Sequence, residues 1–119
     1  MILEIAILAV IPGQGAAFER AMAEAQPLIA ATPGFRGLEV RPCLEIPGRY
    51  ILIVQWDRLE DHTEGFRGSD RYPRWKALLH RFYDPFPVVE HYAAPVVETP
   101  APPDPMVDPV GPVSPAASG

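Results

Sequence analysis

The chain has 119 residues, which is enough for one folded domain, and 48% of them are hydrophobic, as in an ordinary globular protein. Its formal net charge is -5 and its basic residues are scattered singly. This argues against a nucleic-acid partner, because phosphate binding needs clustered Lys and Arg. The single cysteine, Cys43, cannot form an internal disulfide, which fits a reducing compartment.

The apolar N-terminus is predicted to be a buried strand over residues 2–11. It is far shorter than the ~20 residues of a membrane-spanning helix. It also lacks the basic start of a signal peptide, since Glu4 is its only charged residue. We therefore expect a cytoplasmic protein with no membrane partner. Both alternating sets of side chains in this strand are apolar, so both of its faces should be covered.

A helix is predicted over residues 14–31, where Phe18, Met22, Ala25 and Ile29 form one apolar stripe. Pro27 lies inside this pattern and should kink the helix. The sequence Thr-Pro-Gly at residues 32–34 ends it.

A hairpin is predicted next, with strands over residues 35–45 and 50–56. Pro42 cannot donate a ladder hydrogen bond, so the first of these strands should lie at a sheet edge. Residues 46–49 read Ile-Pro-Gly-Arg, which suits a type II turn. Both faces of the second strand, which ends at Trp56, are apolar.

Two helical segments and a strand complete the pattern. Leu59, His62 and Phe66 share one face of a short helix, and a longer helix capped by Ser69 or Asp70 follows. One broad face of that helix carries Tyr72, Trp75, Leu79, Phe82 and Tyr83. The final strand is expected over residues 86–92.

The predicted order is strand, helix, strand, strand, helix, strand. This is the α+β, ferredoxin-like split β-α-β-β-α-β plan, an antiparallel sheet with helices on one face. A domain of this size has helices for only one face, so the other face should meet a second copy in a homodimer. The folded domain is expected to span residues 1–94. Residues 95–119 hold half of the 16 prolines and are expected to form a disordered, proline-rich tail.

From residue 2 to residue 92 the chain resembles the antibiotic biosynthesis monooxygenase (ABM) domain, a family of dimeric α+β barrels. The resemblance rests on the order of several short motifs: the strand-ending Trp56, LEDH at residues 59–62, Gly-Ser-Asp before Tyr72 and Trp75, and FYDPFPVVEHY at residues 82–92. It implies a cofactor-independent monooxygenase that oxidises a planar aromatic molecule (phenolic, anthrone or quinone-like) with O2. It implies no metal and no flavin.

The chain departs from two branches of that family. It contains no asparagine, a residue that the characterised branches place in the site. The positions where the haem-degrading branch has a tryptophan and a histidine fall near Phe66 and Lys76, which disfavours haem degradation.

His62 is the candidate catalytic base, because a neutral imidazole accepts a proton from a phenol near pH 7. Tyr72 is the candidate residue for orienting a substrate oxygen. Phe66, Trp75, Phe82 and Trp56 are the candidate substrate-binding residues. Each has a structural alternative: His62 could hydrogen-bond a backbone carbonyl, and the aromatic side chains could be ordinary core. His91 is interpreted as a surface or dimer-edge residue.

No metal site is predicted, because the three histidines fall in separate elements without ligand spacing. Two hypotheses follow. In the first, the chain is the monooxygenase just described. In the second, it is a non-catalytic dimeric small-molecule-binding or structural protein of the same fold. The two differ in whether His62 reaches a cavity.

Overall fold

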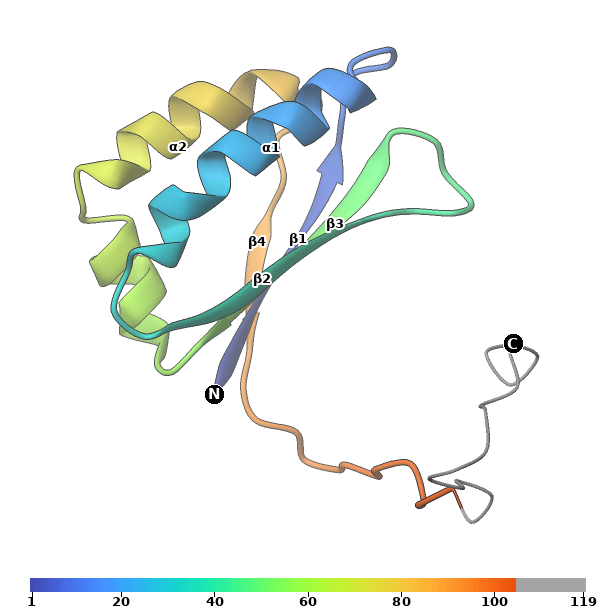
Figure 1. Cartoon of the computed structure of the whole chain (residues 1–119), viewed down its shortest axis with the longest axis vertical. Helices are drawn as coiled ribbons and strands as arrows, with labels where there is room; N and C mark the ends of the chain where they lie inside the picture. Colours follow the sequence, from blue (N-terminus) through green and yellow to red (C-terminus); the bar gives the residue numbers. More distant parts are fainter. Residues whose placement is uncertain (105–119) are drawn as a thin grey trace, which may run out of the picture.

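The computed structural model describes residues 1–104, and in these residues one four-stranded antiparallel sheet is covered by helices on one face (Figure 1). The strand order is β2-β3-β1-β4. The elements are β1 (Ile2–Ala9), α1 (Gly15–Ala30), β2 (Phe35–Pro42), β3 (Arg49–Trp56), the π-helical turn η1 (Asp61–Phe66), α2 (Arg71–Leu79), the 3-10 turn η2 (His80–Phe82) and β4 (Val89–Tyr92). The predicted ferredoxin-like α+β plan is confirmed. Residues 105–119 of the predicted tail lie outside the described residues.

β1 lies in the middle of the sheet, and its register decides which side chains meet. It pairs with β3 from Ile2 opposite Trp56 to Ala9 opposite Arg49. On its other edge it pairs with β4, where Glu4 is opposite His91. Because directly opposed residues point to the same face, Glu4 and His91 share the helix-covered face.

The core lies between this face and the two long helices. α1 buries its predicted stripe, including Phe18, Met22 and Ile29, and α2 buries Trp75 and Leu79. The strands contribute alternate residues, and those of β3 are all less than 10% exposed: Tyr50, Leu52, Val54 and Trp56. α1 continues past Pro27 to Ala30.

The turn at residues 46–49 has the predicted type II form. The Arg49 amide donates to the carbonyl oxygen of Ile46 at 3.2 Å, and Gly48 has φ +82°. A positive φ at the third position of this turn is the reason glycine is favoured there.

Several predicted boundaries or faces were wrong. β1 ends at Ala9 instead of residue 11, and β2 ends at Pro42 instead of residue 45. α2 ends at Leu79, so Phe82 and Tyr83 lie beyond that helix. β4 begins at Val89 instead of residue 86. Prolines 85 and 87 lack the amide hydrogen that a ladder needs, which accounts for the late start of β4. Leu59 is 40% exposed and precedes η1, so it does not share a buried face with His62 and Phe66.

The opposite face of the sheet is apolar at its centre and uncovered in the described part of the chain, and Glu39, Arg41 and Glu90 place charges on its edge strands. Its central side chains are Leu3, Ile5, Ile7, Ile51 and Ile53. Ile7 is 47% exposed, which is unusual for a side chain in the middle of a sheet. We call these five residues the open face.

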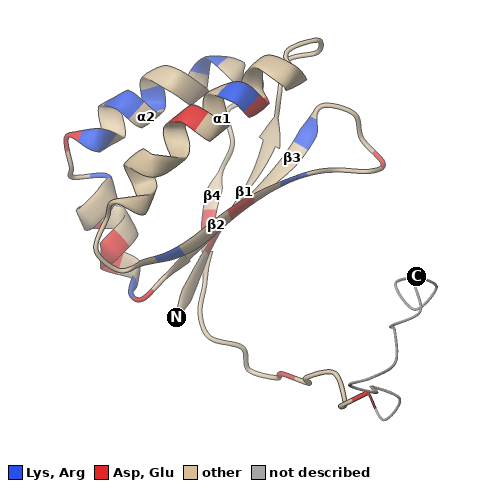
Figure 2. Ribbon diagram, viewed as in Figure 1, with Lys and Arg blue, Asp and Glu red and all other residues tan. Residues whose placement is uncertain are grey.

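Charged residues gather on the helices and loops and almost avoid the two central strands (Figure 2). β1 contains one charged residue, Glu4, and β3 contains one, Arg49 at its start. Glu4 is only 4% exposed. No helix in residues 1–104 is long and apolar enough to cross a bilayer.

Candidate functional site

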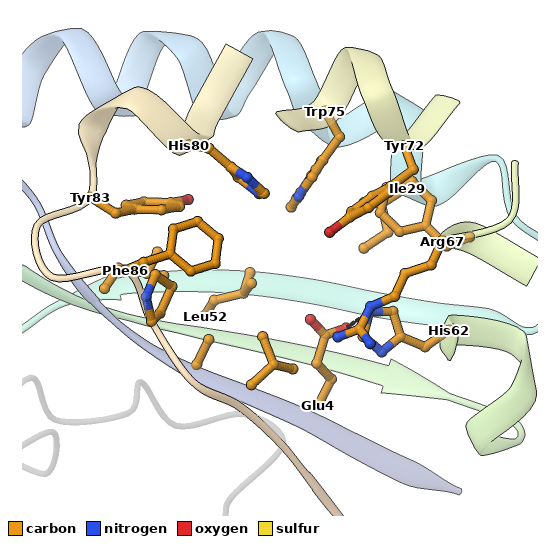
Figure 3. Close-up of a pocket in the computed structure, with 15 residues that line it drawn as sticks. Glu4, Ile29, Leu52, His62, Arg67, Tyr72, Trp75, His80, Tyr83 and Phe86 are labelled. Atoms are coloured by element: carbon orange, nitrogen blue, oxygen red, sulfur yellow. Dashed lines mark ion pairs between the residues drawn. The ribbon is translucent and has the colours of Figure 1, made fainter. Parts of the chain in front are cut away.

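A cavity of about 210 Å³ lies between the helix-covered face of the sheet and the segment from η1 to β4 (Figure 3). Its floor is formed by apolar strand residues: Ala6, Leu8, Leu52 and Val89. One end is polar and the other is aromatic. We call them the polar end (Glu4, His62, Arg67 and Tyr72) and the aromatic end (Trp75, His80, Tyr83 and Phe86).

Glu4 is the centre of the polar end. Its Oε1 accepts a hydrogen bond of 3.0 Å from Nε1 of Trp56. The same oxygen lies 3.4 Å from Nε2 of His62. Trp56 reaches Glu4 because it lies two residues beyond Val54, the direct β3 partner of Glu4.

His62 is fixed in place by contacts on three sides. Its ring stacks on the indole of Trp56, with centroids 5.4 Å apart and planes at 19°. Its Nδ1 lies 2.7 Å from Nε2 of His91, so one ring donates a hydrogen to the other. It sits on η1, a π-helical turn of the kind found frequently at functional sites, in which the Arg67 amide donates to the His62 carbonyl oxygen at 3.1 Å.

Burial dominates the electrostatics of this cluster. It raises the pKa of Glu4, although the hydrogen bond from Trp56 and the charge of Arg67 oppose that shift. Burial, followed by the positive charges of Arg67 and His91, lowers the pKa of His62 to about 3. His62 is therefore neutral near pH 7, so its contact with Glu4 at that pH is not an ion pair.

Arg67 is an exposed residue whose guanidinium extends to the polar end, beside Glu4 and His62 (Figure 3). Within residues 1–104 its side chain has no hydrogen bond or ion pair, and its influence on Glu4 and His62 is through its charge. A guanidinium in that position is suited to an anionic or strongly polarised oxygen of a ligand.

Flat side chains form the aromatic end. The rings of His80 and Phe86 are 4.8 Å apart in an edge-on arrangement, and Tyr83 packs against both. Burial, followed by the charge of Lys76, lowers the pKa of His80, and burial raises the pKa of Tyr83. Near pH 7 this end therefore has an uncharged, mainly aromatic surface.

The sequence-predicted site residues separate into two groups. His62, Tyr72, Phe66 and Trp75 all line the cavity. Trp56 and Phe82 are not among the lining residues. Trp56 is completely buried behind Glu4, and Phe82 is 3% exposed and packs on Phe18 with ring centroids 6.0 Å apart.

The interpretation of His91 as a surface residue was wrong, and its place at a dimer edge stays a prediction. It is half-buried and contacts His62. Alternation along β4 showed that His91 and Glu90 face opposite ways, but only the register with β1 decides which of them faces the helices.

Sequence reasoning missed Glu4 and Arg67. A signal for Glu4 was present, because a lone carboxylate in a strand that is apolar on both faces requires a buried partner. No comparable signal marks Arg67, since its role depends on how the chain turns after η1.

The site can accept a proton at its polar end and hold a flat, uncharged ring at its aromatic end. Tyr72 adds a hydroxyl to the polar end, and its ring packs edge-on against Phe66 with centroids 5.4 Å apart. Among residues 1–104, no group of three or more His, Cys, Asp or Glu side chains is arranged to hold a metal ion.

Comparison with known proteins identifies the class to which this fold and cavity belong. The family model described as antibiotic biosynthesis monooxygenase matches residues 1–78. The chain therefore belongs to the ABM family, as its sequence motifs indicated.

Individual relatives extend the match over most of the chain. YczJ of Bacillus subtilis, described as uncharacterised, is 49% identical over 92 residues, which cover 77% of this chain and 97% of YczJ. A solved structure of a candidate antibiotic biosynthesis monooxygenase from Bordetella bronchiseptica is 34% identical, with a TM-score of 0.75, over 80% of this chain and 97% of that one. SnoaB of Streptomyces nogalater, a cofactor-independent oxygenase, shares the fold with a TM-score of 0.70 at 16% identity, over 81% of this chain and 94% of SnoaB.

Proposed function

We propose that the protein is a cofactor-independent monooxygenase that oxidises a small planar phenol, anthrone or quinone-like molecule with O2. In the simplest case a phenol becomes a quinone. The substrate loses two hydrogen atoms and gains one oxygen atom, and the second oxygen atom of O2 leaves as water. The substrate supplies the electrons, so the balance requires neither metal nor flavin.

The observation that carries the proposal is the division of one cavity into a polar and an aromatic end. Deprotonation of a phenol makes an electron-rich anion that can pass an electron to O2. The polar end offers a buried proton acceptor for that step, and the charge of Arg67 stabilises the anion formed. Membership of the ABM family supports the same reaction class, and cofactor-independent oxygenation is the activity named for SnoaB.

The size of the cavity favours the smaller members of this substrate class. An engineered apolar cavity of ~150 Å³ holds benzene. A cavity of about 210 Å³ is thus suited to one or two fused rings. Phenols and naphthols fit this limit better than three-ring anthrones.

Four residues have proposed roles that come from the sequence. His62 belongs to the proton-accepting group, in which the structure adds Glu4 as its direct partner. Tyr72 orients a substrate oxygen through its hydroxyl. Phe66 and Trp75 provide flat contacts for the ring.

The test is oxygen consumption by the purified protein with 1-naphthol and with anthrone, without added metal or flavin. We expect uptake with 1-naphthol, formation of the quinone, and less uptake with anthrone. His62→Ala should reduce turnover by ~10²-fold or more. Glu24→Gln is the matched control, because Glu24 is exposed on α1 and outside the cavity.

Binding without oxygen uptake would contradict the proposal. It would favour the second hypothesis, in which the chain is a non-catalytic binding or structural protein. Uptake that is unchanged in His62→Ala would retain the reaction but remove His62 from it.

We also propose that the open face pairs with a second copy of the chain. Five apolar side chains in the middle of a sheet have no cover in the described residues, and one of them, Ile7, is 47% exposed. A symmetric partner would bring two such faces together and remove both from water. The cytoplasmic location stays a prediction from the sequence.

A further inference from the structure

We propose that Glu4 is the catalytic base of this site, with Oε2 as the atom that accepts the proton from the substrate hydroxyl. His62 and Trp56 are then positioning residues that fix the carboxylate. This inference rests on the proposed function and assigns its first chemical step to a residue for which sequence analysis gave no role.

The two oxygens of Glu4 have different surroundings. Oε1 accepts a hydrogen bond from Nε1 of Trp56 at 3.0 Å and lies 3.4 Å from Nε2 of His62. Within residues 1–104, no partner is found for Oε2. In Figure 3 one carboxylate oxygen of Glu4 lies toward His62 and the other points up into the cavity. Glu4 is only 4% exposed, yet no fully buried side-chain oxygen in the described residues lacks a partner. Oε2 therefore keeps accessible surface in the cavity, where it can meet a ligand donor.

His62, in contrast, has no ring nitrogen that is open to a ligand. Its Nδ1 is 2.7 Å from Nε2 of His91, and its Nε2 faces Oε1 of Glu4. Stacking on Trp56 also restricts rotation of the ring. A substrate hydroxyl could reach a ring nitrogen of His62 only if one of these contacts were broken.

The proton affinities agree with this geometry. A base works best when its pKa lies close to the working pH. Burial moves the pKa of Glu4 upward, toward neutrality, and moves the pKa of His62 down to about 3, away from it. The same burial that makes the imidazole a weak base makes the carboxylate a stronger one.

The groups that face Glu4 come from every element packed around it. Arg67, which follows η1, contributes a positive charge. His62 on η1 and His91 on β4 are neutral near pH 7, because burial lowers the pKa of both. Tyr72 on α2 supplies a hydroxyl across the cavity. Arg67 is thus the single fixed cation beside the carboxylate in the described residues.

In the proposed step, Glu4 takes a proton from the substrate and later gives it back. The substrate O–H bond breaks, its electron pair stays on the substrate oxygen, and a new O–H bond forms at Oε2 of Glu4. The phenolate passes one electron to O2, and the radical and superoxide combine to a peroxide anion on the ring carbon. Glu4 returns its proton to that anion, giving a hydroperoxide that loses water to form the quinone.

The decisive experiment follows binding of 4-nitrophenolate, a coloured ionised phenol, as a function of pH above the pKa of the free phenol. If Glu4 carries the transferred proton, wild-type protein takes up one proton on binding the anion. Its affinity should then fall ~10-fold for each unit of pH increase. Glu4→Gln imitates the protonated carboxyl group, so its affinity should be higher than that of wild type and almost independent of pH.

Two further variants complete the binding comparison. His62→Gln should keep the pH slope of wild type, because the proton is not held on His62. Glu24→Gln should behave as wild type in both affinity and slope, since it removes an exposed charge on α1. Glu4→Gln retains an oxygen for the Trp56 donor, and its circular dichroism should match wild type.

Turnover provides the second readout. Oxygen uptake with 1-naphthol should fall by ~10²-fold or more in Glu4→Gln, and by less in His62→Gln. A pH slope that persists in Glu4→Gln and disappears in His62→Gln would overturn the assignment of Glu4 while leaving the proposed function intact. If wild-type protein neither binds the phenolate nor consumes oxygen, the proposed function fails and the role of Glu4 with it.

Discussion

The helix-covered face and the open face of the sheet are built from alternate residues of the same strands, yet they differ in exposure and in polar content. In β1, Leu8 faces the helices and is 1% exposed, while its neighbour Ile7 is 47% exposed on the open face. The covered face also contains the charge of Glu4 and the indole N–H of Trp56, which bond each other. The central residues of the open face are all apolar.

The difference shows that apolar character alone does not locate a site. Both faces are apolar at their centres, but in the described residues the buried carboxylate of Glu4 lines a cavity on the covered face. A lone buried carboxylate is stable only where hydrogen bonds or charges compensate it. The covered face is therefore where chemistry is expected, and the open face is where a second protein surface is expected.

Ile7→Lys is the change with the largest expected effect. In a symmetric dimer it would place two ammonium groups in an apolar interface, one from each copy. We expect the dissociation constant to increase by ~10³-fold or more, while each monomer remains folded. Sedimentation velocity over a range of concentrations measures this. A wild-type protein that is monomeric at micromolar concentration would refute the pairing itself.

Leu8→Ala tests the covered face at the adjacent position. Removing a fully buried leucine side chain should lower the free energy of unfolding by about 2–5 kcal/mol. Ile7→Ala is the matched control, and its effect on an unpaired monomer should be clearly smaller. Urea denaturation at several protein concentrations distinguishes the two variants. Only for Ile7→Ala should the loss of unfolding free energy depend on protein concentration. Equal, concentration-independent losses would contradict the distinction between the faces.

The sequence predicted much of this architecture because local patterns determine it. The apolar stripe of α1, the Pro-Gly turn before Arg49 and the order of elements each follow from local periodicity or turn chemistry. The lining positions of His62, Phe66, Tyr72 and Trp75 came from helical spacing in the same way. Their chemical roles remain proposals.

The polar cluster could not be predicted because it joins residues that are distant in the sequence. Glu4 meets Trp56 across 52 positions and His91 only through the pairing of β1 with β4. Register specifies such contacts, and a shift of one residue would turn every side chain to the other face. Periodicity within a single strand contains no information about its register with the next.

Trp56→Phe tests whether the indole N–H supports Glu4. The substitution keeps an aromatic ring but leaves Oε1 without its donor, which should lower the free energy of unfolding by about 1–3 kcal/mol at pH 7. The hydrogen bond from Trp56 lowers the pKa of Glu4, so its loss should raise that pKa further. The loss of unfolding free energy caused by Trp56→Phe should thus be smaller at a pH low enough to protonate Glu4 in both proteins. Equal defects at pH 4 and pH 7 would show that only packing was lost.

His62→Gln tests the buried neutral imidazole. The pKa of His62 is about 3 in the folded protein, whereas an unperturbed histidine side chain, as in an unfolded chain, has a pKa of 6.5. Between these values the unfolded state binds more protons, so wild type loses stability as pH falls below 6.5. From pH 6.5 to about pH 5 the wild type should lose about 1–2 kcal/mol relative to the variant. Parallel pH profiles for the two proteins would contradict burial of a neutral ring.

The smallest effect is expected at a surface ion pair outside the cavity. Arg36 on β2 donates from Nε to Oδ1 of Asp57 at 2.6 Å and from Nη2 to Oδ2 at 2.8 Å, but both side chains are largely exposed. Solvent screening weakens such pairs, so Arg36→Ala should leave the free energy of unfolding almost unchanged. Oxygen uptake and phenolate binding should remain at wild-type values, because neither residue lines the cavity. A loss of activity comparable to that in Glu4→Gln would mean that the β2 edge contributes to the site, and the contrast between a functional covered face and a structural periphery would fail.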